Sequence, residues 1–185
     1  MFPNGWRGFY VLDANGDVVG LPTGSSTDPS GWTTIVSSAD EDITNSSPQI
    51  DGTTDHTQFQ FSVTAGRTYL LDITLAVSGN NATGDYAFRF YVSAGTMDGR
   101  GTNAGLSAAD AATLLLLSVS GAQSSGSFVQ GTTATLTIPT AARVTFAFTP
   151  SNTTTFIFSH GNGSASAGRT SRTMQGSVFR YKQMN

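Results

Sequence analysis

The amino-acid sequence predicts an all-β protein, an antiparallel sandwich of jelly-roll type with a short N-terminal arm or hairpin. Three observations support this prediction. Apolar and polar residues alternate over much of the chain, turn-forming residues recur at short intervals, and Ser and Thr make up about a quarter of the 185 residues. Thr favours strands, whereas Ser and the 21 Gly favour the turns between strands.

The alternation has a period of two, which is typical of strands that bury one face. The apolar positions are Phe59, Phe61 and Val63; Tyr69, Leu71, Ile73, Leu75 and Val77; Tyr86, Phe88, Phe90 and Val92; Leu136 and Ile138; Val144, Phe146 and Phe148; Phe156 and Phe158; and finally Val178 with Arg180 or Phe179 with Tyr181. About eight strands of this kind indicate a sandwich or barrel.

Turn-forming runs separate these segments at residues 65–66, 78–81, 99–101, 121–126 and 150–152.

One stretch breaks the alternation of apolar and polar residues. Ser107 is a candidate helix N-cap and Asp110 would lie in the first turn, so we expect a short helical turn that leads into a buried strand over residues 114–119.

The first 21 residues form a distinct segment. Two apolar runs flank residues 13–17, and the central Asn15-Gly16 pair predicts a hairpin. Residues 22–31 are rich in Ser, Thr, Gly and Pro and predict a linker or long loop. We therefore divide the chain into an arm and linker, residues 1–31, and a jelly-roll domain, residues 32–185.

Composition limits the kinds of partner that we expect for this chain. Charged residues are only 11% of the chain, the net charge is −3, and the 9 Lys and Arg are scattered, so we expect no nucleic-acid partner. The longest apolar run, residues 114–117, is far too short to span a membrane. Residues 1–6 do not resemble a signal peptide. Cys is absent, which excludes disulfides and thiol catalysis.

No pattern of catalytic residues stands out. His56 and His160 lie in a Ser-rich chain, but no Gly-x-Ser-x-Gly turn accompanies them. Residues 13–17 match the start of a calcium loop, but Val18 stands where the loop requires Gly. Residues 40–42, Asp-Glu-Asp, are either a solvated loop or a divalent-ion site at a subunit contact. We expect no enzymatic activity, no cofactor and no resident metal.

Three segments resemble a pattern found in bacteriophage virion proteins. Residues 38–46 (SADEDITNS) form an acidic turn, residues 59–69 (FQFSVTAGRTY) end a strand in Val-x-Ala-Gly-x-x-Tyr, and residues 174–182 (MQGSVFRYK) resemble a final Gly-Ser-x-x-x-x-Arg strand. The resemblance covers roughly residue 35 to the end of the chain, and its motifs are structural.

The resemblance implies a jelly roll similar to the tumour-necrosis-factor and complement globular-head domains, which usually assemble as trimers. Phages use such domains as capsid-decorating cement knobs and as fibre or spike tips. We expect a homotrimer, in which alternating aromatics could supply both a core and an axial seam; these are Tyr86, Phe88, Phe90, Phe146 and Phe148.

The function expected is that of a structural virion protein, a capsid decoration (cement) protein that stabilises a phage head. It would be assembled in the host cytoplasm and lie on the outer surface of the capsid, with the major capsid protein as partner. The alternative is a receptor-binding tip of a tail fibre or spike. That alternative predicts a longer N-terminal shaft with heptads or repeats, and the sequence contains none.

The arm is the expected partner-binding site. Its anchors are Phe2, Trp6, Phe9, Tyr10 and Leu12. Disordered segments are poor in aromatics, and an isolated hairpin is marginally stable in water, so a partner surface would have to bury these side chains. The other possibility is that the arm packs on its own domain and completes the core.

Overall fold

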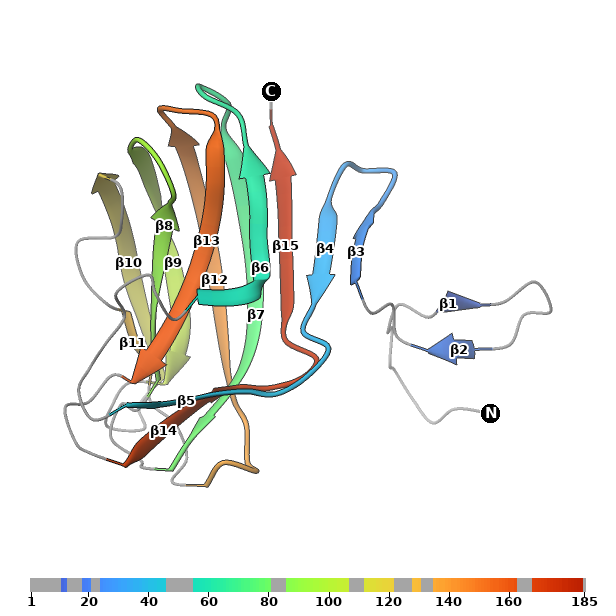
Figure 1. Cartoon of the computed structure of the whole chain (residues 1–185), viewed down its shortest axis with the longest axis vertical. Helices are drawn as coiled ribbons and strands as arrows, with labels where there is room; N and C mark the ends of the chain where they lie inside the picture. Colours follow the sequence, from blue (N-terminus) through green and yellow to red (C-terminus); the bar gives the residue numbers. More distant parts are fainter. Residues whose placement is uncertain are drawn as a thin grey trace.

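The computed structural model describes residues 11–12, 18–20, 24–45, 55–80, 86–106, 112–121, 128–130, 135–162 and 168–184. Within these ranges every regular element is a β-strand and every strand pair is antiparallel. Two sheets face each other as a sandwich (Figure 1). The predicted all-β, jelly-roll-like class is confirmed.

The larger sheet has nine strands in the described part of the chain. Seven follow one another in the order β10 (Ala112–Gly121), β9 (Met97–Leu106), β12 (Thr140–Pro150), β7 (Tyr69–Gly79), β15 (Val178–Gln183), β4 (Thr33–Val36) and β3 (Gly24–Thr27). The other two are β14 (Arg169–Thr173), which pairs with the end of β7, and β5 (Glu41–Asn45), which pairs with β14. In Figure 1, β5 and β14 run across one end of the sandwich.

The smaller sheet has the order β11 (Phe128–Gln130), β8 (Tyr86–Val92), β13 (Thr154–Asn162) and β6 (Asp55–Val63). A third, two-stranded sheet consists of β1 (Val11–Leu12) and β2 (Val18–Gly20). The pairing of β1 with β2 confirms the hairpin expected in the arm, although residues 13–17 between them lie outside the described residues.

The core lies between the two sheets and is mostly aromatic. Phe90 of the small sheet stacks on Phe146 of the large sheet with ring centroids 4.7 Å apart. Phe156 stacks in the same way on Phe148, at 4.6 Å. Each such ring contributes on the order of 2 kcal/mol through the apolar area that it removes from water. The alternation of the sequence therefore marks the inner face of each sheet.

The last strand settles an alternative that the sequence left open. Phe179 is fully buried in the core and Tyr181 packs against it, whereas Val178 and Arg180 are only partly buried.

The suggested axial seam is wrong. Its five aromatics are at most 1% exposed within a single chain, because they fill the space between the two sheets. They are Tyr86, Phe88, Phe90, Phe146 and Phe148. Side chains this deeply buried are not available to a neighbouring subunit. The homotrimer stays a prediction, and it requires another contact surface.

The turn expected at residues 99–101 is also wrong, because these residues lie inside β9. A Cβ atom at Gly101 would be 2.0 Å from the carbonyl oxygen of Thr145, and one at Gly99 would be 2.5 Å from the ring of Phe146. The glycines let β9 pack tightly against β12 and its aromatic side chains. This glycine run resembles a loop in the sequence, but in the structure it allows the backbones of β9 and β12 to approach each other closely.

Two other local expectations failed in part. Residues 24–27 of the expected linker form edge strand β3. Leu136 and Ile138 were expected in a strand, but they lie in a turn closed by a hydrogen bond from the Ile138 amide to the carbonyl of Thr135, and Ile138 is exposed. Pro139 follows and has no amide hydrogen for a sheet.

The strand expected over residues 114–119 is confirmed inside β10, while the helical turn at residues 107–111 lies outside the described residues. The division of the chain at residue 31 stays a prediction.

Candidate interaction surface

The corner between β3 and β4 is a tight turn built on Asp28. Its Oδ1 accepts hydrogen bonds from the Ser30 amide at 2.9 Å, the Ser30 hydroxyl at 2.6 Å and the Trp32 amide at 3.1 Å. Gly31 adopts the left-handed conformation, with φ of 82°, that closes the turn. The hydrogen bond from the Ser30 hydroxyl is the main reason that the pKa of Asp28 lies below its ordinary value. The polar turn sequence thus becomes a fixed corner.

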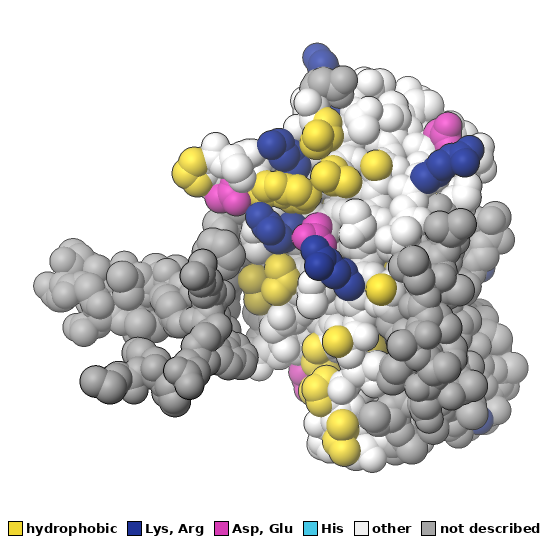
Figure 2. Space-filling view, turned by 180° about the vertical axis from the view of Figure 1, so that it is seen from behind, with side chains coloured by type: hydrophobic (Ala, Val, Ile, Leu, Met, Phe, Trp, Pro, Cys, Tyr) yellow, Lys and Arg dark blue, Asp and Glu magenta, His cyan; other side chains and the backbone are white. Residues whose placement is uncertain are grey.

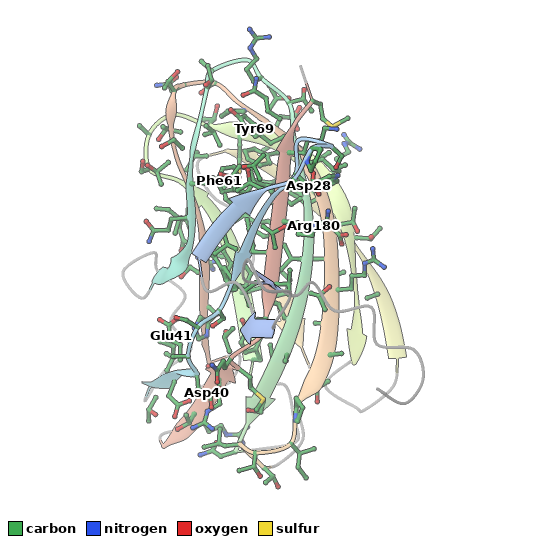
Figure 3. The ribbon with its side chains drawn as sticks, turned by 90° about the vertical axis from the view of Figure 1, so that its right-hand side faces the viewer. Asp28, Asp40, Glu41, Phe61, Tyr69 and Arg180 are labelled. Atoms are coloured by element: carbon green, nitrogen blue, oxygen red, sulfur yellow. The ribbon has the colours of Figure 1, made fainter. Side chains whose placement is uncertain are left out.

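Arg180 of β15 ties this corner to the middle of the large sheet. Its guanidinium lies 3.4 Å from Asp28 Oδ2 and 4.9 Å from the centre of the Trp32 ring. The ion pair and the cation–π contact together hold the β3–β4 hairpin against β15 (Figure 3). Since β3 follows the arm directly in the chain, the arm is joined to a fixed edge of the domain.

The outer face of the large sheet carries charges of both signs. Arg143 of β12 forms a two-point hydrogen bond with Asp72 of β7, at 3.1 and 3.3 Å, and Asp72 lies opposite Arg180 in the sheet register. Figure 2 shows basic, acidic and hydrophobic side chains interspersed over the visible face. Arg143 is two-thirds exposed, so this pair adds little stability. The outer face of the large sheet therefore presents acidic and basic side chains together.

The expected anchors fall largely outside what the structure describes. Phe2, Trp6, Phe9 and Tyr10 lie outside the described residues. Leu12 is in β1, opposite Val18 of β2. The arm therefore stays a predicted partner-binding segment. Sequence reasoning missed the corner at the end of β3, although Trp32 and the Asp28 turn sequence were visible signs.

The acidic run at residues 40–42 is neither a solvated loop nor an open ion site. Glu41 begins β5, and Asp42 pairs with Arg172 of β14 through two hydrogen bonds, of 2.5 and 2.8 Å. Asp40 lies 3.2 Å from the same guanidinium and accepts the amide of Gln175 at 2.8 Å. Arg172 thus neutralises both aspartates, and its hydrogen bonds lower the pKa of Asp42.

Behind this cluster, His160 is fully buried and stacks on Tyr86 with ring centroids 5.4 Å apart. Its Nε2 lies 3.7 Å from Glu41 Oε2. The hydroxyls of Tyr86 and Thr173 are hydrogen-bonded at 2.8 Å, and burial raises the pKa of the tyrosine. The β5–β14 ribbon therefore closes this end of the sandwich, and His160 is inaccessible to a substrate in solution.

A shallow hollow lies at the other end, beside the ends of β9 and β12. Its volume is about 680 Å³. The lining is formed mainly by small and hydroxyl-bearing residues: Gly66, Thr96, Met97, Asp98, Ser120, Gly121, Thr149, Pro150 and Ser151. Among the described residues of this lining, Asp98 is the single titratable one.

In the described part of the chain, no group of three or more His, Asp or Glu side chains is placed to hold a metal ion. The same residues include no helix with the length and apolar character needed to cross a membrane.

Comparisons with known proteins find weak structural likeness only. No protein-family model matches the sequence, and no curated protein matches it. Among solved structures, the chain is similar to the VP2 subviral particle of infectious bursal disease virus, with a TM-score of 0.24, 12% identity and coverage of 99% of this chain and 49% of that chain. For the Gx strain of that virus the TM-score is 0.24, the identity 11%, and the coverage 82% of this chain and 38% of that chain.

The chain thus spans less than half the length of these two viral chains. Likenesses of this size do not establish a function.

Proposed function

We propose that the chain is a structural virion protein that decorates a phage head as a capsid cement protein, anchored by its N-terminal arm. The observation that carries the proposal is the separation of the arm from the sandwich sheets. Strands β1 and β2 pair with each other and form a sheet of their own, joined to neither sheet of the sandwich. The arm is thus a distinct element that precedes β3, the edge strand whose other end carries the fixed corner at Asp28 and Trp32.

The sandwich itself supports a structural role. Where burial is described, the core cluster and the side chains packed against it lie between residues 35 and 181 and fill the space between the two sheets. The resemblance of three segments to phage virion proteins supports the choice of a capsid, and the proposal keeps the trimer that this resemblance implies. It assigns the protein no catalytic step, and its expected partner is the major capsid protein.

Deletion of residues 1–21 tests the proposal. We expect the truncated protein to keep its cooperative melt and its subunit stoichiometry but to lose binding to capsids stripped of their decoration. The control is the full-length chain with Ser62→Ala. Ser62 is exposed on strand β6 of the smaller sheet, so this variant should bind like the wild type. Loss of the cooperative melt on truncation would show that the arm belongs to the core and would overturn the anchor.

Location on intact particles separates the two phage functions. The cement function predicts that labelled protein covers the head. Label confined to the tail would instead favour a receptor-binding tip and would overturn decoration.

A further inference from the structure

The edges of the sandwich differ in how well they are protected. An open edge presents unpaired backbone N–H and C=O groups, and natural proteins protect such edges by short strands, charges, proline, bulges or covering segments. Strand β10 borders the large sheet and has none of the first four protections. Its ten residues, ATLLLLSVSG, include no charge and no proline. Its register with β9 runs without interruption from Ala112 to Gly121.

The other described edges are protected. Strand β3 has four residues and ends at the Asp28 turn, and β11 has three residues. Strand β5 carries Glu41 and Asp42. Strand β6 has nine residues, but it contains Asp55, contacts β4, and its pairing with β13 shifts register near Ser159. Among the described strands, none pairs with the outer side of β10.

We propose that the outer edge of β10 pairs antiparallel with β10 of a second copy of this chain, so that the large sheets of two subunits form one continuous sheet. Length excludes β3 and β11, which are less than half as long as β10, and the nine-residue β6 is disfavoured by Asp55 and its irregular register, whereas a second β10 matches β10 along its whole length. Charge selects it too: β10 contains no ionisable side chain, so two copies meet without like-charge repulsion.

The symmetry of this contact follows from sheet geometry. Paired residues of an antiparallel ladder lie on the same face, so the two-fold axis must be normal to the sheet and centred on a residue. Centring on Leu116 or Leu117 pairs the most residues. This isologous contact is separate from the three-fold contact of the proposed trimer. With the two-fold axis crossing the three-fold axis at a right angle, both contacts together would join two trimers into a hexamer.

Charged substitutions on the edge test the pairing by mass. Ser118 and Ser120 are exposed on β10, so the double variant Ser118→Lys/Ser120→Lys should fold while protecting the edge as lysines do in natural sheets. The matched control, Ser62→Lys/Thr145→Lys, adds the same charge at two exposed sites away from β10. We expect sedimentation equilibrium to give an even-numbered wild-type assembly, half that mass for the edge variant, and the wild-type mass for the control.

Equal masses for the wild type and the edge variant would overturn the pairing, as would open-ended aggregates in place of a discrete wild-type assembly. Binding to stripped capsids is a separate readout, so failure of the edge contact and failure of the anchor are distinguishable.

Cross-linking provides a second test that does not depend on the lysine variant. The chain has no Cys, so Ser118→Cys introduces a unique thiol. In either centring the two thiols lie within four residues along the ladder, about 13 Å, which a bismaleimide of that span can bridge. Thr145→Cys is the control, because five interstrand spacings, roughly 24 Å, would separate its two copies. We expect a covalent dimer for Ser118→Cys alone, and its absence would overturn the pairing.

Discussion

The ring of Tyr181 stacks on the ring of Phe61, with centroids 3.8 Å apart and ring planes 14° apart. Phe61 belongs to the small sheet and Tyr181 to the last strand of the large sheet, so this contact joins the two layers. Tyr69, whose ring lies 5.9 Å from that of Phe61, accepts a hydrogen bond from the Thr64 amide and donates one to Gln183. Residues 59–69 and 174–182, two of the three motif segments, therefore meet in one structural cluster.

Replacing Phe61 with alanine should lower the free energy of unfolding by about 3–5 kcal/mol, the usual effect of removing a buried ring. The side chain is 7% exposed and contacts rings of both sheets. Chemical denaturation measures the change. Tyr181→Phe keeps the stacked ring and is the control. A loss below about 1 kcal/mol for Phe61→Ala would place little of the core's stability in this contact.

Gly101→Ala should destabilise the domain strongly, because the new methyl group would meet the Thr145 carbonyl oxygen at 2.0 Å. We expect a loss of about 3 kcal/mol or more, at the upper end of overpacking effects. Gly66→Ala is the comparison: its Cβ meets nothing within 4 Å, and only the left-handed φ of 69° opposes it, which costs about 1 kcal/mol. Equal melting temperatures for the two variants would contradict the close approach of β9 and β12.

Tyr86→Phe should lower the free energy of unfolding by about 1–2 kcal/mol, because it removes one partner of a buried hydrogen bond and leaves the Thr173 hydroxyl unsatisfied. Adding Thr173→Val should then cost less than it does in the wild-type background. A double-mutant cycle by thermal denaturation measures the coupling. Strictly additive effects would argue against the hydrogen bond between β8 and β14.

The ion pair of Asp42 and Arg172 should make stability depend on pH in the acid range. The pKa of Asp42 is lowered in the folded protein, mainly by the hydrogen bonds from Arg172, so its ionised form stabilises the fold above the ordinary pKa of 3.8. This contribution should disappear as the pH falls through the lowered folded pKa. Acid titrations of stability should show a smaller loss over that range in Asp42→Asn, and identical curves would contradict the assignment.

The sequence predicts the long strands well because each has one buried face. In the run from Tyr69 to Val77, every second side chain enters the core, and that alternation survives as a local pattern. Strands β5 and β14 leave no such trace. They are short, and they pair residues that are far apart in the chain, such as Asp42 with Arg172. Charged residues at a sheet end resemble a loop until their partner is known.

The candidate surface also has one part that the sequence predicts and one part that it does not. The arm is recognisable from its aromatic residues, because such residues are unusual in a free tail. The corner between β3 and β4 depends on Arg180, which reaches Asp28 and Trp32 from the other end of the chain. Neither the ion pair nor the ring contact follows from spacing in the sequence. Gly101 belongs to the same class, since only the position of Thr145 gives it a reason to be glycine.

The order of strands in the large sheet also sets a distance. Strands β3 and β10 are the first and last of seven, so six spacings, about 29 Å, separate the edge that carries the arm from the edge proposed to pair. Two subunits joined through β10 would hold their β3 strands at opposite rims of the continuous sheet, roughly 60 Å apart before sheet twist is considered. With each arm bound to a capsomer as proposed, one such pair would link two separate capsomers. The continuous sheet between the two subunits would then keep these capsomers from moving apart.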